Sequence, residues 1–127
     1  RLADQEQTVR EVFAVGRHGG RRTGAVMLLD GQGKLTGLFT DSDLARLFEQ
    51  RRDESMDAPI REVMTPEPIT VPLGTRVIDA VEIMRRRKIS ELPVVDGRDM
   101  PVGMLDITDL IGLIPREEAE KVMRVAG

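Results

Sequence analysis

The sequence predicts an α/β (α+β) protein made of two β-α-β-β-α units packed with pseudo-twofold symmetry. The first observation is an internal repeat. Residues 37–44 (GLFTDSDL) return as residues 103–110 (GMLDITDL), and residues 24–31 return as residues 90–97, both at an offset of 66. The second is that short apolar strands alternate with helical apolar stripes in each copy. Two copies are too few for a stacked array, so we expect a symmetric pair with a cleft between its halves.

The first half of the second copy predicts a strand and a helix. A β-branched strand at 69–71 follows the turn 66–68, and a helix runs from an N-cap at Thr75 to about Arg87. Apolar residues at helical spacing form one buried stripe of that helix: Val77, Ala80, Val81 and Met84.

The second half of this copy predicts a β-hairpin and a last helix. Strands at 92–95 and 101–105 flank the turn signal Asp96-Gly97. The helix that follows is capped by Asp106 or Thr108. Its apolar face consists of Leu110, Ile111 and Ile114.

The first copy has the same order, with residues 1–3 opposite 69–71. Its helix aligns at an offset of 68, so two extra residues lie in the loop 17–23. The counterpart of the segment 63–66 (VMTP) in the first copy would lie upstream of Arg1, so we expect a segment cut from a longer protein. The predicted boundaries are a first unit at 1–52, a linker at 53–62, a second unit at 63–114 and a tail at 115–127 that can form a short helix.

Composition excludes several classes of protein. The 127 residues are 40% hydrophobic and 32% charged, which is typical of a soluble globular chain. A net charge of −3 and the absence of Trp and Tyr argue against nucleic-acid binding. No cysteine is present to form a disulfide, and no apolar run is long enough to span a membrane. We expect a cytoplasmic protein without a membrane or nucleic-acid partner.

Three motifs together resemble those of a tandem CBS domain pair, also called a Bateman module. They are VMTP at 63–66, LPVVD at 92–96 and the Gly-x-x-Thr-x-x-Asp ending at 37–43. The resemblance covers essentially the whole chain. Residues 87–95, followed by 103–110, are most similar to the C-terminal CBS pair of arabinose-5-phosphate isomerases, a sugar-phosphate isomerase family. In that family the catalytic domain precedes the CBS pair, so the resemblance implies an N-terminal isomerase domain in the same chain.

Thr40 and Asp43 form the sharpest candidate for ligand binding. At a strand-to-helix junction, a carboxylate can accept from ribose hydroxyls, while a hydroxyl and first-turn amides favour phosphate. The structural alternative is that Thr40 is only an N-cap, with Asp43 at the N3 position of a capping box. The resemblance to CBS pairs favours nucleotide binding.

The second copy departs from this pattern at Asp106, which stands in the position of Thr40. A carboxylate there repels phosphate unless a metal or an Arg intervenes. Asp109 still matches the ribose-binding position. We therefore expect two unequal half-sites.

The resemblance further implies a role for backbone around the base. The residues concerned are Thr70, Val26, Met27, Leu92 and Pro93. It also implies a homodimer of CBS pairs and a regulatory ligand that is an adenine or cytidine nucleotide or a nucleotide-sugar. The alternatives are an architectural dimerisation module that binds no ligand, and a CBS pair from a different parent enzyme or transporter.

Catalysis and metal binding have little support in the sequence. His18, the only histidine, lies in a Gly/Arg loop without a nucleophile pattern nearby. Paired carboxylates such as Glu117 and Glu118 are more simply helix-terminal charges, and no structural zinc site can be assembled. The basic runs after the first helix of each copy, at 17–22 and 85–88, suit helix C-termini. We expect no catalytic residue and no cofactor.

Overall fold

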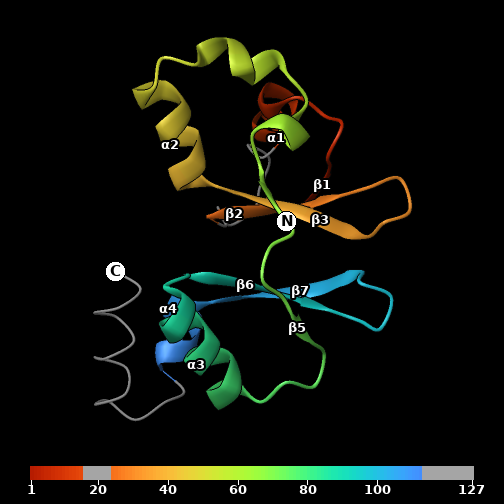
Figure 1. Ribbon diagram of the computed structural model, residues 1–127, viewed down its shortest axis with the longest axis vertical. Coiled ribbons are helices and arrows are strands. Elements are labelled where there is room, and N and C mark those ends of the chain that lie inside the picture. Colours follow the sequence, from red (N-terminus) through yellow and green to blue (C-terminus); the bar gives the residue numbers. More distant parts are fainter. Residues whose placement is uncertain (16–23, 113–127) are drawn as a thin grey trace. The chain divides into compact units, whose positions relative to one another are not determined.

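The computed structural model describes residues 1–15 and 24–112. The chain divides into two compact units, Arg1–Pro68 (unit 1) and Ile69–Gly127 (unit 2). Each unit combines one small sheet with helices (Figure 1). The predicted α/β class is therefore confirmed. The predicted tail at 115–127 and the loop with Arg17, His18, Arg21 and Arg22 lie outside the described residues.

Unit 1 has a four-stranded sheet in the order β1-β2-β3-β4. Strand β1 is parallel to β2, while β3 is antiparallel to both β2 and β4. The elements in chain order are β1 (Leu2–Asp4), α1 (Val9–Val15), β2 (Ala25–Leu29), β3 (Leu35–Thr40), α2 (Asp41–Glu49), the 3-10 helices η1 (Asp53–Asp57) and η2 (Ile60–Glu62), and β4 (Thr65–Pro66).

The core of unit 1 is mainly aliphatic and draws on helices and sheet alike. Its one aromatic pair is Phe13 and Phe39, whose rings meet edge to face with centroids 5.8 Å apart. Burial of these apolar side chains fixes the helices against the sheet. The fully or nearly fully buried members are Val9, Val12, Val26, Leu28, Phe39, Leu47 and Ile60.

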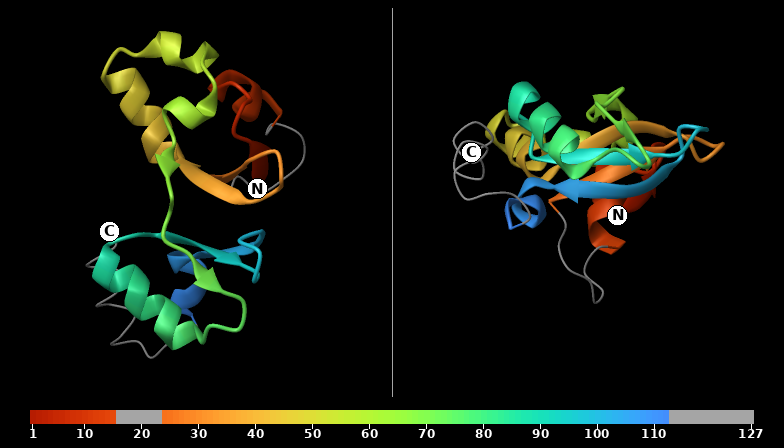
Figure 2. Two further views of the ribbon diagram at one scale, coloured as in Figure 1. Left: turned by 45° about the vertical axis from the view of Figure 1, so that its right-hand side comes forward. Right: turned by 90° about the horizontal axis from the view of Figure 1, so that it is seen from below.

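Unit 2 has a three-stranded sheet in the order β5-β6-β7, with its helices on one face (Figure 2). Strand β5 is parallel to β6, and β6 is antiparallel to β7. The elements are β5 (Val71–Pro72), α3 (Val77–Arg87), β6 (Glu91–Val95), β7 (Pro101–Asp106) and α4 (Ile107–Ile111). The core consists of Val71, Ala80, Val81, Met84, Leu92, Ile107 and Leu110.

Helix α3 differs from its prediction at its N-terminal end. The N-cap is Arg76, which makes no side-chain cap, and the Thr75 hydroxyl instead donates to the Pro72 carbonyl oxygen at 2.7 Å. The predicted cap at Thr75 is therefore wrong, because the preceding turn uses its hydroxyl. Val77, predicted to be buried, is exposed, whereas the rest of the predicted stripe is buried. The helix ends at Arg87 as predicted.

The two hairpins repeat one another in detail. Both pairings shift register at equivalent positions, between Leu28 and Leu29 and between Val94 and Val95. In unit 2, Asp96 Oδ1 accepts from the backbone N–H groups of Arg98 at 2.8 Å and Met100 at 3.1 Å. These two hydrogen bonds lower the pKa of the Asp96 carboxyl.

The hairpin turn of unit 1 is built in the same way. There Asp30 Oδ1 accepts from the backbone N–H groups of Gln32 at 2.8 Å and Lys34 at 3.0 Å. Both Asp-Gly turn signals of the repeat therefore form hairpin turns of one design. The repeat predicted from sequence is confirmed down to these hydrogen bonds.

Residues 53–66 pack on unit 1. Ile60, near the end of the predicted linker 53–62, is buried in the core of unit 1. Thr65–Pro66, predicted to open the second unit, pairs instead with β3, where Gly37 faces Pro66. The compact units consequently divide after Pro68, later than the sequence repeat suggests. We call residues 53–66 the covering segment.

Candidate functional site

The junction between β3 and α2 holds the first candidate pair in a capping box. Thr40 is the N-cap in extended conformation, and its Oγ1 accepts from the Asp43 N–H at 3.1 Å. In return, Asp43 Oδ2 accepts from the Thr40 N–H at 2.8 Å. The structural alternative considered for this pair is thus present in the molecule, because two otherwise unpaired N–H groups are satisfied reciprocally.

The capping box leaves both side chains able to bind a further group. The Thr40 hydroxyl acts as an acceptor in the box, so its own hydrogen stays free to be donated. Each Asp43 oxygen has a second lone pair, although Oδ1 already accepts from Arg46 Nη1 at 3.1 Å. The Asp43 side chain is only 16% exposed, so a ligand would reach it edge-on. The arrangement suits a hydroxyl-rich anionic ligand.

Sequence reasoning did not assign Arg46 a part in this junction. The signal was available, because Asp43 and Arg46 are opposite charges three residues apart on a helix. Arg46 is more than half exposed and places a positive charge beside the carboxylate. It can therefore neutralise Asp43 or turn toward an anion.

The predicted base-bounding residues of unit 1 lie beside this junction in the central strand β2. Ala25 pairs with Thr40, and Val26 and Met27 follow it in the strand with buried side chains. The Met27 N–H donates to the Arg1 carbonyl oxygen at 2.9 Å. That backbone donor is already used within the sheet.

The equivalent junction in unit 2 is built differently. Asp106 is the N-cap of α4, and its Oδ1 accepts from both the backbone N–H of Thr108 at 2.9 Å and the Thr108 hydroxyl at 2.6 Å. The Asp109 side chain is exposed and, within the described residues, makes no hydrogen bond or ion pair. A carboxylate therefore occupies the cap position here, where unit 1 has the Thr40 hydroxyl.

The remaining predicted site residues belong to unit 2. Leu92 and Pro93 are buried in β6, and Thr70 is exposed immediately before β5. The structure thus brings Val26, Met27, Thr40 and Asp43 together in unit 1. It holds Thr70, Leu92, Pro93, Asp106 and Asp109 in unit 2.

The described residues form neither a metal cluster nor a membrane-spanning helix. Across 1–15 and 24–112, no three His, Cys, Asp or Glu side chains gather to hold a metal ion. In those ranges, too, no helix has the length and apolar character to cross a bilayer.

At the end of α3, Arg85 pairs with Glu82 at 2.6 Å, which lowers the pKa of the Glu82 carboxyl.

Comparison with known proteins gives a family match over part of the chain and several relatives. A family model described as the CBS domain matches residues 60–116. Arabinose 5-phosphate isomerase KdsD of Pseudomonas aeruginosa is 41% identical over 88 residues, covering 69% of this chain and 27% of the relative. The corresponding enzyme of Salmonella typhi is 34% identical over 121 residues, covering 87% of this chain and 36% of the relative. The chain therefore spans about a quarter to a third of the length of these relatives.

Solved structures share the fold. A conserved CBS domain protein from Thermoplasma acidophilum matches with a TM-score of 0.82 and 20% identity, covering 98% of this chain and 69% of that one. CBSX2 in complex with AMP matches with a TM-score of 0.74 and 20% identity, covering 89% and 85%. The cytosolic domain of the Mg2+ channel MgtE in complex with ATP matches with a TM-score of 0.75 and 22% identity, covering 89% and 44%.

Proposed function

We propose that this chain, which belongs to the CBS-domain proteins, is a non-catalytic regulatory module that senses a nucleotide or nucleotide-sugar. We further propose that it serves an N-terminal arabinose-5-phosphate isomerase domain of the same cytoplasmic protein. Identities of 34–41% to arabinose 5-phosphate isomerases support this parentage. The observation that carries ligand binding is the junction of Thr40 and Asp43, which keeps a hydroxyl donor and carboxylate lone pairs after capping its helix.

In this proposal each residue has a distinct role. Asp43 accepts from the ribose hydroxyls, while the Thr40 hydroxyl and the first-turn amides of α2 bind phosphate. Asp109 is the ribose acceptor of the second half-site. The backbone around the base is contributed by Val26, Met27, Thr70, Leu92 and Pro93. Two structural neighbours, CBSX2 in complex with AMP and the cytosolic domain of MgtE in complex with ATP, support this ligand class.

The two half-sites are proposed to be unequal. In unit 2 the Asp106 carboxylate stands where unit 1 has the Thr40 hydroxyl, so a phosphate would meet a negative charge. Like charges brought together in a partly desolvated site repel strongly. The first half-site therefore binds the phosphorylated ligand, and the second is weak or takes a different group.

Calorimetric titration with AMP, ATP, CMP, CTP and a cytidine-linked sugar tests the proposal. Wild-type protein releases or absorbs heat with at least one member. Asp43→Asn keeps an oxygen for the helix cap but loses the charge, so affinity falls about 10- to 100-fold, as expected for a charged hydrogen bond of ~1.5–3 kcal/mol. Asp41→Asn, an exposed carboxylate in the same helical turn, is the matched control and leaves affinity unchanged.

Regulation requires the ligand to prefer one arrangement of the parent enzyme over another. An end product that carries an activated sugar nucleotide is a suitable feedback ligand, and two such chains are proposed to associate as a homodimer. The architectural alternative is favoured by one observation, namely that the capping box alone accounts for both Thr40 and Asp43. Absence of heat for every nucleotide at millimolar concentration, together with a stable dimer by sedimentation, would establish that alternative.

A further inference from the structure

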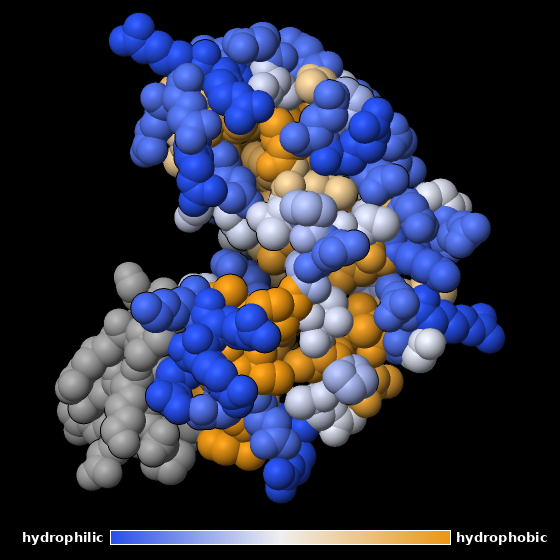
Figure 3. All heavy atoms as spheres, viewed as in Figure 1, coloured by the Kyte–Doolittle hydropathy of each residue, from blue (hydrophilic) through white to orange (hydrophobic). Residues whose placement is uncertain are grey.

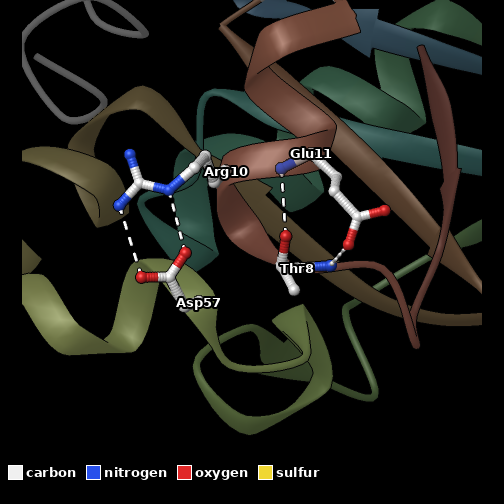
Figure 4. Close-up of polar contacts among 4 residues, drawn as sticks. All are labelled: Thr8, Arg10, Glu11 and Asp57. Atoms are coloured by element: carbon white, nitrogen blue, oxygen red, sulfur yellow. Dashed lines mark hydrogen bonds and ion pairs between the residues drawn. The ribbon is translucent and has the colours of Figure 1, made fainter.

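The covering segment packs against α1 and the turn before it. The backbone N–H of Ile60 donates to the Gln7 carbonyl oxygen at 2.7 Å, and that of Arg61 donates to the Gln5 carbonyl oxygen at 3.0 Å. Arg10 on α1 binds Asp57 through Nε at 2.9 Å and Nη2 at 3.4 Å (Figure 4). Under this cover Val9, at the start of α1, is fully buried.

The same segment also closes the outer edge of β3. Strand β4 pairs with β3 through Gly37 and Leu38, and the backbone N–H of Glu67 extends the pairing to the Thr36 carbonyl oxygen at 3.1 Å. The Met64 side chain fills the space above Gly37, so that a methyl group on Gly37 would overlap its sulfur. Gly37 is buried as a result.

Within the described residues, unit 2 presents the same two surfaces without a cover. Among the described ranges, no strand pairs with β7 on its side away from β6. Gly103, the repeat partner of Gly37 at offset 66, has open space where unit 1 has Met64. Strand β7 is correspondingly less buried than β3.

The exposed face beside α3 is apolar. At an offset of 68, Gln5, Val9 and Arg10 of unit 1 correspond to Leu73, Val77 and Ile78. These three side chains are 70%, 39% and 51% exposed. Apolar residues gather on the corresponding part of unit 2 in Figure 3. Exposed apolar side chains of this kind mark an interaction surface, and so does an open strand edge.

We propose that unit 2 binds a covering segment of its own, which adds a strand to the free edge of β7. The segment inserts a long apolar side chain over Gly103 and lays an apolar turn on Leu73, Val77 and Ile78. Addition of an extended segment to an open edge satisfies the backbone groups, while side-chain pockets give specificity. The occupant is the stretch of the same polypeptide that immediately precedes Arg1.

The repeat identifies this occupant. In unit 1 the cover is the stretch that immediately precedes the first strand of the other repeat copy, with four residues between Pro66 and Val71. The register places Ala3 in the position of Val71, since their partners Leu28 and Val94 are 66 residues apart. The equivalent of β4 therefore falls three to four residues upstream of Arg1. The related isomerases are about two and a half times as long as this chain, which leaves room for such a segment.

A synthetic peptide of residues 60–68 (IREVMTPEP) is the first probe, added to the 127-residue chain and followed by NMR. We expect saturable shifts in the amides of β7 and the methyl groups of Val77 and Ile78, and none with a scrambled peptide. Gly103→Ala meets nothing in the described structure, so it folds normally but weakens the peptide at least about tenfold. Gly97→Ala, at another open glycine in the hairpin turn, is the matched control and binds normally. Shifts that miss β7, or a peptide indifferent to Gly103→Ala, overturn the proposal.

The second test extends the chain by its own twenty or so preceding residues. The β7 amides then become protected from exchange, the peptide no longer binds, and Gly103→Ala lowers Tm although it is neutral in the 127-residue chain. If the peptide binds the extended chain equally well, the occupant is not the preceding segment. If β7 protection in the 127-residue chain rises with protein concentration, the occupant is a second copy and the proposal is wrong.

Discussion

Units 1 and 2 share a hairpin with the same register shift and the same aspartate-capped turn, yet they bury that hairpin to different extents. In unit 1 the outer strand β3 carries Gly37 and Phe39, both buried beneath the covering segment. In unit 2 the outer strand β7 has no fully buried residue. The difference teaches that one sequence repeat is not one complete structural unit, because the cover of unit 1 is encoded next to the second copy.

The family match makes the same point. It begins at residue 60, so the apolar turn of Ile60 belongs by sequence to the second copy, whereas the side chain lies in the core of unit 1. Exchange of this kind ties the folding of one unit to residues that flank the other. The largest mutational effects should therefore come from the covering segment.

Ile60→Ala should produce the largest difference in stability between the two units. Loss of a fully buried Ile costs about 2–5 kcal/mol, and we expect that loss in unit 1 only. Hydrogen exchange resolved by residue measures the two units separately. Val77→Ala, at an exposed position of unit 2, should cost less than ~1 kcal/mol. Equal loss of protection in both units would show that they unfold as one body and would break the comparison.

Thr8→Ala should have an intermediate effect. Thr8 caps α1 in a second capping box, since its Oγ1 accepts from the Glu11 N–H at 3.1 Å and Glu11 Oε1 accepts from the Thr8 N–H at 3.2 Å (Figure 4). Its removal should cost about 1 kcal/mol by denaturant unfolding. The repeat partner Arg76 makes no such cap, so Arg76→Ala should stay within about 0.5 kcal/mol. A larger loss at Arg76 would contradict this difference between the two helices.

The smallest effect should come from the exposed pair of Arg10 and Asp57, which has no counterpart at Ile78. The hydrogen bond from Arg10, and then its charge, lower the pKa of the Asp57 carboxyl. A lowered folded-state pKa contributes stability that is present above the unfolded value of ~3.9 and is lost as the pH falls through the folded value.

The measurement is Tm against pH for wild type and Asp57→Asn. Wild type should be slightly more stable above about pH 5, and the two curves should converge as the pH falls through the lowered pKa of the Asp57 carboxyl. Glu54→Gln, at an exposed acid of the same 3-10 turn, is the control. A gap between wild type and Asp57→Asn that stays constant into acid would exclude the ion pair as its cause.

Local pattern alone determined much of this protein. The 66-residue repeat, the two Asp-Gly hairpins and the end of α3 at Arg87 follow from side-chain periodicity and turn chemistry, which act over a few residues. The capping box of Thr40 and Asp43 was available for the same reason, as one of two interpretations of a spacing of three.

Tertiary structure decided what those local rules leave open. Thr75 satisfies the helix N-cap pattern, but its hydroxyl was taken by the Pro72 carbonyl of the preceding turn. Val77 and Val9 occupy the same place in the repeat, yet Val9 is buried and Val77 is exposed, because, in the part of the chain that the structure describes, α1 lies beneath a covering segment and α3 does not. Ile60 and β4 joined unit 1, although the repeat groups them with the second copy. Burial depends on which distant segment packs against a side chain and excludes water from it. The pattern of neighbouring residues does not contain that information.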